Sequence, residues 1–430
     1  MRATFTFWWG VEWRRGREPG RRFGSRAEDA PSDVHQIDDH SRVPSLSGLP
    51  AVLPERPVRV FFPCTGLGRQ RRGFETFTLE CAGALRHDPT LEIRVFAGGP
   101  VSELPVHVLA NLPRDSRAAR WLAAFHRRDS YFSEQLTFFL SFLPHLIRGA
   151  PDVVYFADLN LGNLCWHWRR LSGQRYRLLY YNGGLTTKPF TRADAVQQLT
   201  PAGLAEAQER GEDTSRQVVL PHGVNVPEDV PTRIIGDARR TLGLPADRMV
   251  VLSAGLLDVA IKRMDVLIRE IARLPAPRPF LVLLGAENAE SVTIRALAND
   301  LLGAENVLIR TLAPHEMDAY YRAADAFALA SLREGFGLAY VEALAHGLPV
   351  IAHDFPVTRY LLDGFGALAD LRVEGELARL VSVTLQKPIT EDERRQRHAS
   401  AKARFGWPAL MNEYSTMLHW AASLPLRAAT

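Results

Sequence analysis

Two glutamates, Glu334 and Glu342, stand eight positions apart in a stretch whose residue pattern predicts strand, turn and helix. The apolar run 326–330 is typical of a buried parallel strand, and 338–346 has the spacing of a helix. Glu334 is therefore expected in the turn at the carboxyl end of a strand, where open α/β sheets bind ligands. Glu342 is expected about one turn into the helix, so both carboxylates can face one crevice.

The turn between that strand and that helix reads Glu-Gly-Phe-Gly-Leu over residues 334–338. Its two glycines let the backbone approach a ligand closely. The free N–H groups at the start of the following helix favour phosphate. Two glutamates in thirty residues also fit a solvated surface, but a turn of this composition between two apolar strands favours the binding site.

A second group of candidates lies upstream, where Gly255 closes a predicted strand (249–254) and Lys262 and Arg263 open a predicted helix (262–274). A lysine at a helix start suits a diphosphate. Two basic residues at a helix start more often belong to a solvated surface when nothing else is known.

A glycine loop with Gly66 and Gly68 follows the first predicted strand, 57–63, and a helix and a strand follow the loop. A dinucleotide fingerprint requires glycine at position 71, where this chain has Arg71. By itself the loop fits a tight structural turn as well as a ligand site.

The alternation of strands and helices predicts an α/β protein with parallel doubly wound sheets, and 430 residues suggest two domains. The expected organisation is a disordered leader (1–55), an N-terminal Rossmann-like domain (56–220), a C-terminal Rossmann-like domain (221–404) and a final helix (405–430). The leader is arginine-rich, then acidic, and a mis-assigned start codon explains it equally well.

Composition limits the function classes. A net charge of +4 is slight for this length and gives no support to a nucleic-acid partner. Cys64, Cys81 and Cys165 are odd in number and lack metal spacing, which predicts reduced thiols in a cytoplasmic protein. No apolar stretch has the length of a membrane span, and the N-terminus lacks a secretion signal. Peripheral contact with the inner face of a membrane stays open.

The stretch 325–354 resembles the donor-site signature of retaining glycosyltransferases of family 4, which have the two-domain GT-B fold, and the resemblance extends over about 57–422. It implies that Glu334 faces the donor sugar and that Glu342 takes the ribose hydroxyls. It also implies that the diphosphate is held by the backbone of three turn residues: Phe336, Gly337 and Leu338.

The same resemblance implies that 56–220 is the acceptor-side domain and 221–404 the nucleotide-sugar-binding domain, and it assigns further donor-binding positions and one crossover element. It implies that Lys262, after Gly255, contacts the diphosphate and that the final helix braces the first domain. It also implies that Gly66 and Gly68 approach the donor phosphate and the acceptor, and that Thr311 and Leu312 meet the nucleotide base.

Two positions depart from the family pattern. Asn182 stands where a histidine is common, and an amide can hydrogen-bond a hydroxyl but cannot carry a proton. Leu256 stands where an arginine is usual. We hypothesise that Arg263 supplies the missing guanidinium; a place on the solvated helix face is the alternative.

The implied reaction is retaining transfer of a hexose from a UDP- or GDP-sugar to a small-molecule, glycan or lipid-linked acceptor. No metal or other cofactor is expected, because the chain has no Asp-x-Asp motif and its histidines lack ligand spacing. One alternative is a degenerate GT-B protein that acts as a non-catalytic binding or partner subunit, which Asn182 and Leu256 would favour. Another is a nicotinamide-dependent oxidoreductase, against which Arg71 counts.

Overall fold

The computed structural model describes residues 56–70, 73–184 and 191–427, all of them within one compact unit of the chain. The expected leader, 1–55, lies outside the described residues, as does Arg71.

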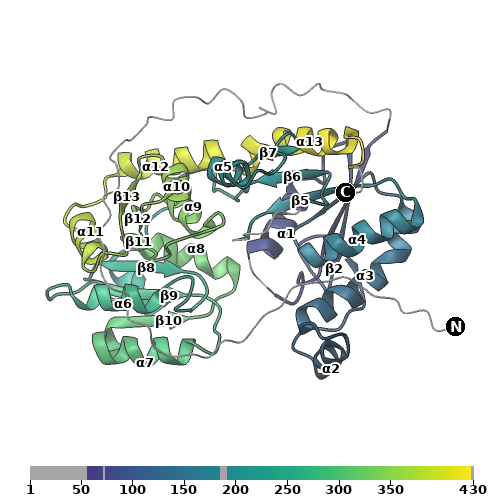
Figure 1. The fold of residues 1–430 in the computed structure, drawn as a ribbon. Helices are drawn as coiled ribbons and strands as arrows, with labels where there is room; N and C mark the ends of the chain where they lie inside the picture. Colours follow the sequence, from purple (N-terminus) through teal and green to yellow (C-terminus); the bar gives the residue numbers. More distant parts are fainter. Residues whose placement is uncertain (1–55, 71–72, 185–190, 428–430) are drawn as a thin grey trace, which may run out of the picture. The chain divides into compact units, whose positions relative to one another are not determined.

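The N-terminal half of the described chain builds a seven-stranded sheet in which all neighbouring strands are parallel (Figure 1). In sheet order the strands are β3 (His107–Val108), β2 (Leu91–Ala97), β1 (Val58–Cys64), β4 (Val153–Phe156), β5 (Arg177–Asn182), β6 (Ala195–Gln198) and β7 (Gln217–Val219). The helices are α1 (Gly73–Leu85), α2 (Arg117–His126), α3 (Ser130–Gly149), α4 (Leu159–Ser172) and α5 (Pro201–Glu209).

Both faces of this sheet are buried, as parallel sheets require. Side chains alternate along β1, so Phe62 enters a core with Phe77 of α1, and Phe61 enters a separate core with Phe142 of α3. The near-continuous apolar run of β1 follows from burial on both sides.

The second half repeats the architecture with a six-stranded parallel sheet (Figure 1). Its strands, in sheet order, are β10 (Val307–Arg310), β9 (Phe280–Leu284), β8 (Val250–Ala254), β11 (Ala326–Ala328), β12 (Val350–His353) and β13 (Gly366–Ala369). Its helices are α6 (Met264–Ala272), α7 (Ser291–Leu302), α8 (Pro314–Ala323), α9 (Leu338–Ala345), α10 (Pro356–Leu362) and α11 (Glu376–Leu385), with the 3-10 helices η2 (Gly236–Leu242) and η3 (Ala304–Asn306).

In both sheets the order of strands reverses beside the first strand, between β1 and β4 in one and between β8 and β11 in the other. At such a switch point the two following connections leave on opposite faces, which opens a crevice at the carboxyl ends of the strands. The prediction of an α/β protein with two parallel doubly wound sheets is confirmed.

Two helices end the described chain, α12 (Glu391–Phe405) and α13 (Trp407–Ser423), with Gly406 between them. Helix α13 packs against α1, β1, β4 and β5 of the first half. The Trp407 indole N–H donates to Glu80 of α1 at 3.1 Å, and the Tyr414 hydroxyl donates to the carbonyl of Pro221 at 2.7 Å. The final helix therefore begins two residues later than predicted and lies on the first half.

None of the helices within the described ranges has the length and apolar character of a membrane span.

Candidate functional site

The switch point of the second sheet brings together two of the predicted site residues. Strands β8 and β11 are neighbours, Lys262 lies in the connection after β8, and Glu334 lies in the connection after β11. The Lys262 ammonium donates to Oε1 of Glu334 at 2.7 Å, and Glu334 is almost fully buried. An ammonium has three donors, so two remain for an anion in the crevice.

Lys262 is held by a turn that precedes the helix. The Asp258 carboxylate accepts the N–H groups of Ile261 and Lys262 at 2.8 and 2.6 Å, and the Asp258 carbonyl accepts from Met264. The predicted helix start at 262 is therefore wrong: α6 begins at Met264, and Arg263 has a left-handed φ of 51°. The sequence pattern missed the buried Asp258, which competes for the N–H groups of the first turn.

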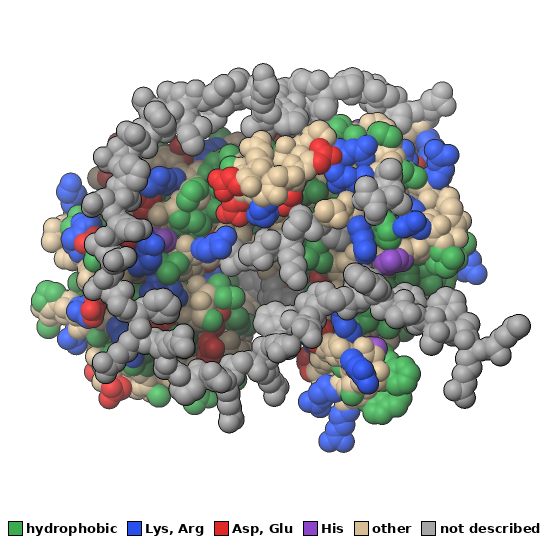
Figure 2. Space-filling view, in the orientation of Figure 1, with side chains coloured by type: hydrophobic (Ala, Val, Ile, Leu, Met, Phe, Trp, Pro, Cys, Tyr) green, Lys and Arg blue, Asp and Glu red, His purple; other side chains and the backbone are tan. Residues whose placement is uncertain are grey.

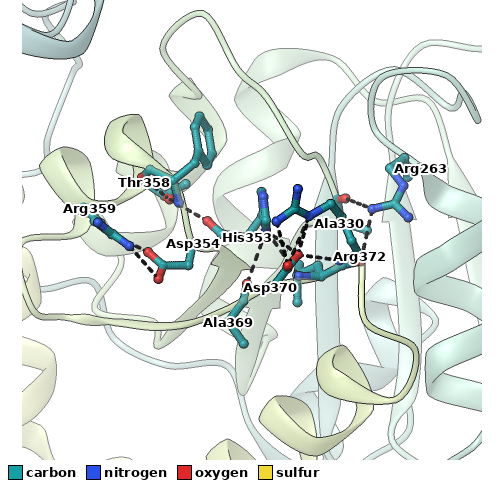
Figure 3. Close-up of polar contacts among 11 residues, drawn as sticks. Arg263, Ala330, His353, Asp354, Thr358, Arg359, Ala369, Asp370 and Arg372 are labelled. Carbon is teal, nitrogen blue, oxygen red and sulfur yellow. Dashed lines mark hydrogen bonds and ion pairs between the residues drawn. The ribbon is translucent and has the colours of Figure 1, made fainter. Parts of the chain in front are cut away.

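Arg263 points its guanidinium at the ends of two strands. Nη1 donates to the carbonyl oxygens of Ala330, after β11, and Leu371, after β13, at 3.2 Å each (Figure 3). The Leu371 N–H in turn donates to Nδ1 of His353 at 3.2 Å. Arg263 is therefore not confined to a solvated face. Its second terminal nitrogen has no hydrogen bond to any other described residue, so its predicted contact with a diphosphate stays a prediction.

Gly255 lies at the carboxyl end of β8, where the backbone of the neighbouring β9 comes close. A Cβ on Gly285, after β9, would collide with the Gly255 carbonyl, and a Cβ on Gly255 would meet the Lys262 side chain at 3.0 Å. Gly285 also accepts the Thr311 hydroxyl at 2.7 Å through its carbonyl. The two glycines thus permit a close approach of backbones below Lys262, and Gly285 was missed by the sequence pattern. Leu312, the second predicted base contact, is partly buried against the core.

The turn 334–338 is held tightly from the side of the first sheet. A Cβ on Gly335 would collide with the carbonyl of Gly183, which follows β5. Gly337 has a φ of 93°, a conformation that favours glycine, and α9 begins at the next residue, Leu338.

Phe336 fixes the same turn through its ring. It is buried and stacks on His222, with ring centroids 5.8 Å apart, and meets Phe405 edge-on. Burial lowers the pKa of His222 to about 4, so this imidazole is neutral at physiological pH. The Phe336 side chain serves packing, and its predicted backbone contact with the diphosphate is untested.

Glu342 lies in the second turn of α9, and the Tyr321 hydroxyl donates to its Oε2 at 2.6 Å. Tyr321 comes from α8, where no sequence signal marked it. This hydrogen bond fixes the orientation of the carboxylate and leaves the other oxygen, Oε1, for a ligand.

Asn182 ends β5 and lines one pocket with Glu334 and Gly335. Its amide nitrogen donates to Gln198 at 2.8 Å, while its oxygen is buried and has no hydrogen-bond partner among the described residues. The other lining residues come from both halves of the chain: Gly184, Gln198, Leu199, Thr200, Ala202, Gly203, Glu206, Arg210, Arg333, Phe355, Pro356 and Val357. The structure therefore brings Asn182 and Glu334 to one hollow.

The glycine loop of the first sheet is built around backbone contacts. Gly68 has a φ of 82°, and a Cβ there would collide with Gly99; Gly66 accepts N–H groups from Arg69 and Gln70 through its carbonyl. These contacts give both glycines a structural reason, and their predicted approach to a donor stays a prediction.

At the first switch point Thr65 donates to Asp158 at 3.1 Å, joining the ends of β1 and β4. The Thr65–Asp158 pair is the counterpart of the Lys262–Glu334 pair, with a hydroxyl where the second sheet has an ammonium. Of these two described pairs, the one in the second sheet therefore includes the cation that an anionic ligand needs.

The described residues contain no cluster of three or more His, Cys, Asp and Glu side chains that could hold a metal ion. The expectation of a metal-free reaction therefore stays a prediction. Cys64, Cys81 and Cys165 are all buried and free.

Residues 235–403 match the family described as Glycosyl transferases group 1. This segment of the chain carries Lys262, Glu334 and Glu342. The match supports the Glycosyl transferases group 1 family for the second sheet and its helices.

Curated relatives are similar over a comparable share of the chain. The D-inositol 3-phosphate glycosyltransferase of Xylanimonas cellulosilytica is 33% identical over 220 residues, which are 46% of this chain and 49% of the relative. The D-inositol 3-phosphate glycosyltransferase of Mycolicibacterium smegmatis is 34% identical over 216 residues, which are 47% of this chain and 48% of the relative. The chain spans about half the length of these relatives.

Solved structures resemble the chain over most of its length and show the fold. Sucrose-phosphate synthase from Thermosynechococcus elongatus has a TM-score of 0.71 at 20% identity, over 85% of this chain and all of its own. Anabaena HepE, in complex with UDP-glucose, has a TM-score of 0.64 at 19% identity, over 84% of this chain and 99% of its own. With both parallel sheets covered, the fold is GT-B.

Proposed function

We propose that this protein is a retaining hexosyltransferase that moves a sugar from a nucleotide-diphosphate donor, UDP- or GDP-linked, to a small-molecule, glycan or lipid-linked acceptor. The observation that carries the proposal is the Lys262–Glu334 ion pair at the second switch point, within the segment matched by Glycosyl transferases group 1. The named relatives and the UDP-glucose complex of HepE support the reaction class.

In the proposed reaction the donor diphosphate lies between Lys262 and the start of α9. The two free donors of the ammonium and the N–H groups after Gly337 stabilise the negative charge that grows on the leaving diphosphate. Because these groups provide positive charge and hydrogen bonds, the proposal includes no metal ion.

Glu334 is proposed to orient the sugar hydroxyls and to stabilise positive charge near the ring, beside its bond to Lys262. Retention is proposed to follow from attack on the face that the diphosphate leaves, with the diphosphate oxygen taking the acceptor proton. The acceptor oxygen then forms the new bond to the anomeric carbon as the bond to the diphosphate breaks.

Glu342, oriented by Tyr321, is proposed to bind the ribose hydroxyls, and Asn182 to hydrogen-bond the donor without transferring a proton. The buried oxygen of Asn182, which has no donor among the residues that the structure describes, supports this role, since a buried acceptor without a donor is costly.

The decisive experiment is a screen of UDP- and GDP-sugars against the full chain, first for binding and then for release of nucleotide diphosphate. Turnover with one donor, abolished in Lys262→Ala, supports the proposal. Binding of a sugar nucleotide with no release, with or without acceptor extracts, would instead favour a non-catalytic GT-B subunit.

A further inference from the structure

Helix α2 exposes the large apolar side chains that a helix of a soluble protein usually buries. Trp121 is 72% exposed and Phe125 is 79% exposed, whereas Ala119 and Ala123 face the protein. The two aromatic rings lie one turn apart and stack with centroids 6.3 Å apart and planes at 14°. The small apolar side chains of α2 are therefore inside and its largest ones outside, beside polar residues, whereas the large apolar side chains of a surface helix usually face the protein.

Four arginines frame this aromatic pair. At 100° per residue, Arg117 lies about 40° around the helix axis from Trp121 and Arg120 about 100°, and Arg127 and Arg128 follow the last turn. All four are exposed. Arg128 lies over the Phe132 ring at 4.5 Å and donates to Asn160. We call these residues the α2 face: Arg117, Arg120, Trp121, Phe125, Arg127 and Arg128. Figure 2 shows basic and hydrophobic side chains side by side over α2.

Among the described residues, the charge of the α2 face has few acidic partners. Arg117, Arg120 and Arg127 form no ion pair with any of these residues, and α2 itself contains no acidic residue. The flanking acids are Asp115 and Asp129, and the Asp129 carboxylate caps α3 by accepting the Phe132 N–H at 2.7 Å. The four arginines thus outnumber the acids near them.

From this arrangement we infer that the α2 face binds an anionic lipid surface. Aromatic rings on a surface helix enter the boundary between headgroups and acyl chains, and arginines beside them are attracted to anionic headgroups. A second copy of this chain fits the face less well, because a two-fold contact would set the arginines of both copies against each other. The inference stands independently of the proposed reaction.

The test uses the full chain and vesicles of phosphatidylcholine mixed with phosphatidylglycerol, compared with phosphatidylcholine alone, in a flotation assay. The expected result is binding to the mixed vesicles only, weakened by added salt because the arginine contribution is screened. Trp121→Ala with Phe125→Ala should abolish binding. Arg117→Gln with Arg120→Gln should weaken binding about 25-fold, from about fivefold per arginine.

A matched control replaces two exposed aliphatic side chains on the second half, Val292→Ala with Val383→Ala, which are 74% and 53% exposed. This control should bind vesicles like the unaltered chain, and all variants should keep the same midpoint of urea unfolding in lipid-free buffer. The inference is overturned if the unaltered chain does not float with the mixed vesicles, or if the α2 variants float equally well. It is also overturned if sedimentation shows self-association that the α2 variants abolish while vesicle binding is absent.

Discussion

The Lys262 ammonium and the Glu334 carboxylate, 72 positions apart in the chain, form an ion pair of 2.7 Å across the switch point of the second sheet. The pair joins the connections after β8 and β11, and Glu334 is buried beneath it. An ion pair of this kind holds both side chains in place before a donor binds. Removing either partner would leave the charge of the other uncompensated.

Glu334→Gln should fold normally and lose about a hundredfold in kcat. The amide oxygen can still accept from Lys262, but the charge aimed at the reacting ring is gone, a loss on the order of 3 kcal/mol. Single-turnover nucleotide release measures the effect. Glu376→Gln, a change at a half-exposed position at the start of α11, serves as the control, and near-normal turnover in Glu334→Gln would remove the proposed role.

Glu342→Ala should weaken donor binding with little change in kcat, since a ribose contact is equal in the ground and transition states. Tyr321→Phe should also weaken donor binding, but only by about threefold to tenfold, because it removes one hydrogen bond that orients Glu342. Calorimetric titration with the donor measures the affinity of both variants. A fall in kcat with unchanged affinity would contradict the ribose assignment.

Turnover should survive excess EDTA. The diphosphate charge is proposed to be stabilised by Lys262 and by N–H groups at the start of α9. The measurement is nucleotide release before and after chelation, with readdition of magnesium or manganese. Activity lost to EDTA and restored by either ion would show that a metal takes part.

Arg263→Ala should lower the free energy of unfolding by about 2 kcal/mol, because two carbonyl oxygens lose their donor. If Arg263 also replaces the arginine absent at Leu256, donor affinity should fall about tenfold and Leu256→Arg should partly restore it.

Arg263→Gly is the matched control for the backbone. It also lacks the guanidinium, but glycine tolerates the φ of 51°, so it should be more stable than the alanine variant by about 1 kcal/mol. Unchanged donor affinity in both variants would leave Arg263 with a structural role alone.

Glu80→Gln should stabilise the protein at alkaline pH. Burial, opposed by the Trp407 hydrogen bond and reinforced by Glu342, raises the pKa of Glu80 to about 7, above its ordinary value of 4.5. A raised carboxyl pKa means that the native state binds the proton more tightly than the unfolded state does. The free energy of unfolding therefore falls as pH rises from 4.5 through 7 and Glu80 loses its proton.

The variant should therefore exceed the unaltered chain by about 2 to 3 kcal/mol above pH 8 and match it near pH 4.5. Urea unfolding at both pH values gives the difference, and Glu209→Gln, an exposed change on α5, gives the background. A stability difference that does not vary with pH would show that Glu80 does not titrate in this range.

Local patterns were enough to predict the two parallel sheets and the place of Glu334 and Glu342. Buried parallel strands are short continuous apolar runs, and the 334–338 turn joins such a strand to a helix, so neighbouring residues carry the information. The same holds for Gly337, whose φ of 93° agrees with the glycine in the sequence. What the sequence alone determined is thus the α/β class, the strands and helices with the clearest apolar patterns, and the chemical types at the carboxyl ends of those strands.

Tertiary structure decided which of these residues meet and which are already engaged. Tyr321 and Gly285 act on the site through contacts with residues distant in sequence. Asp258 acts by competing for the N–H groups of a helix start. Neither kind of contact leaves a periodic signal in the sequence. The helix predicted from Lys262 failed for this reason, since the Asp258 carboxylate takes the N–H groups that would have begun it. Likewise, the arginines and aromatics of α2 are an ordinary amphipathic pattern in sequence. Only packing decides which side of a helix faces the protein, and here the alanine side is buried while Trp121 and Phe125 are left in solvent.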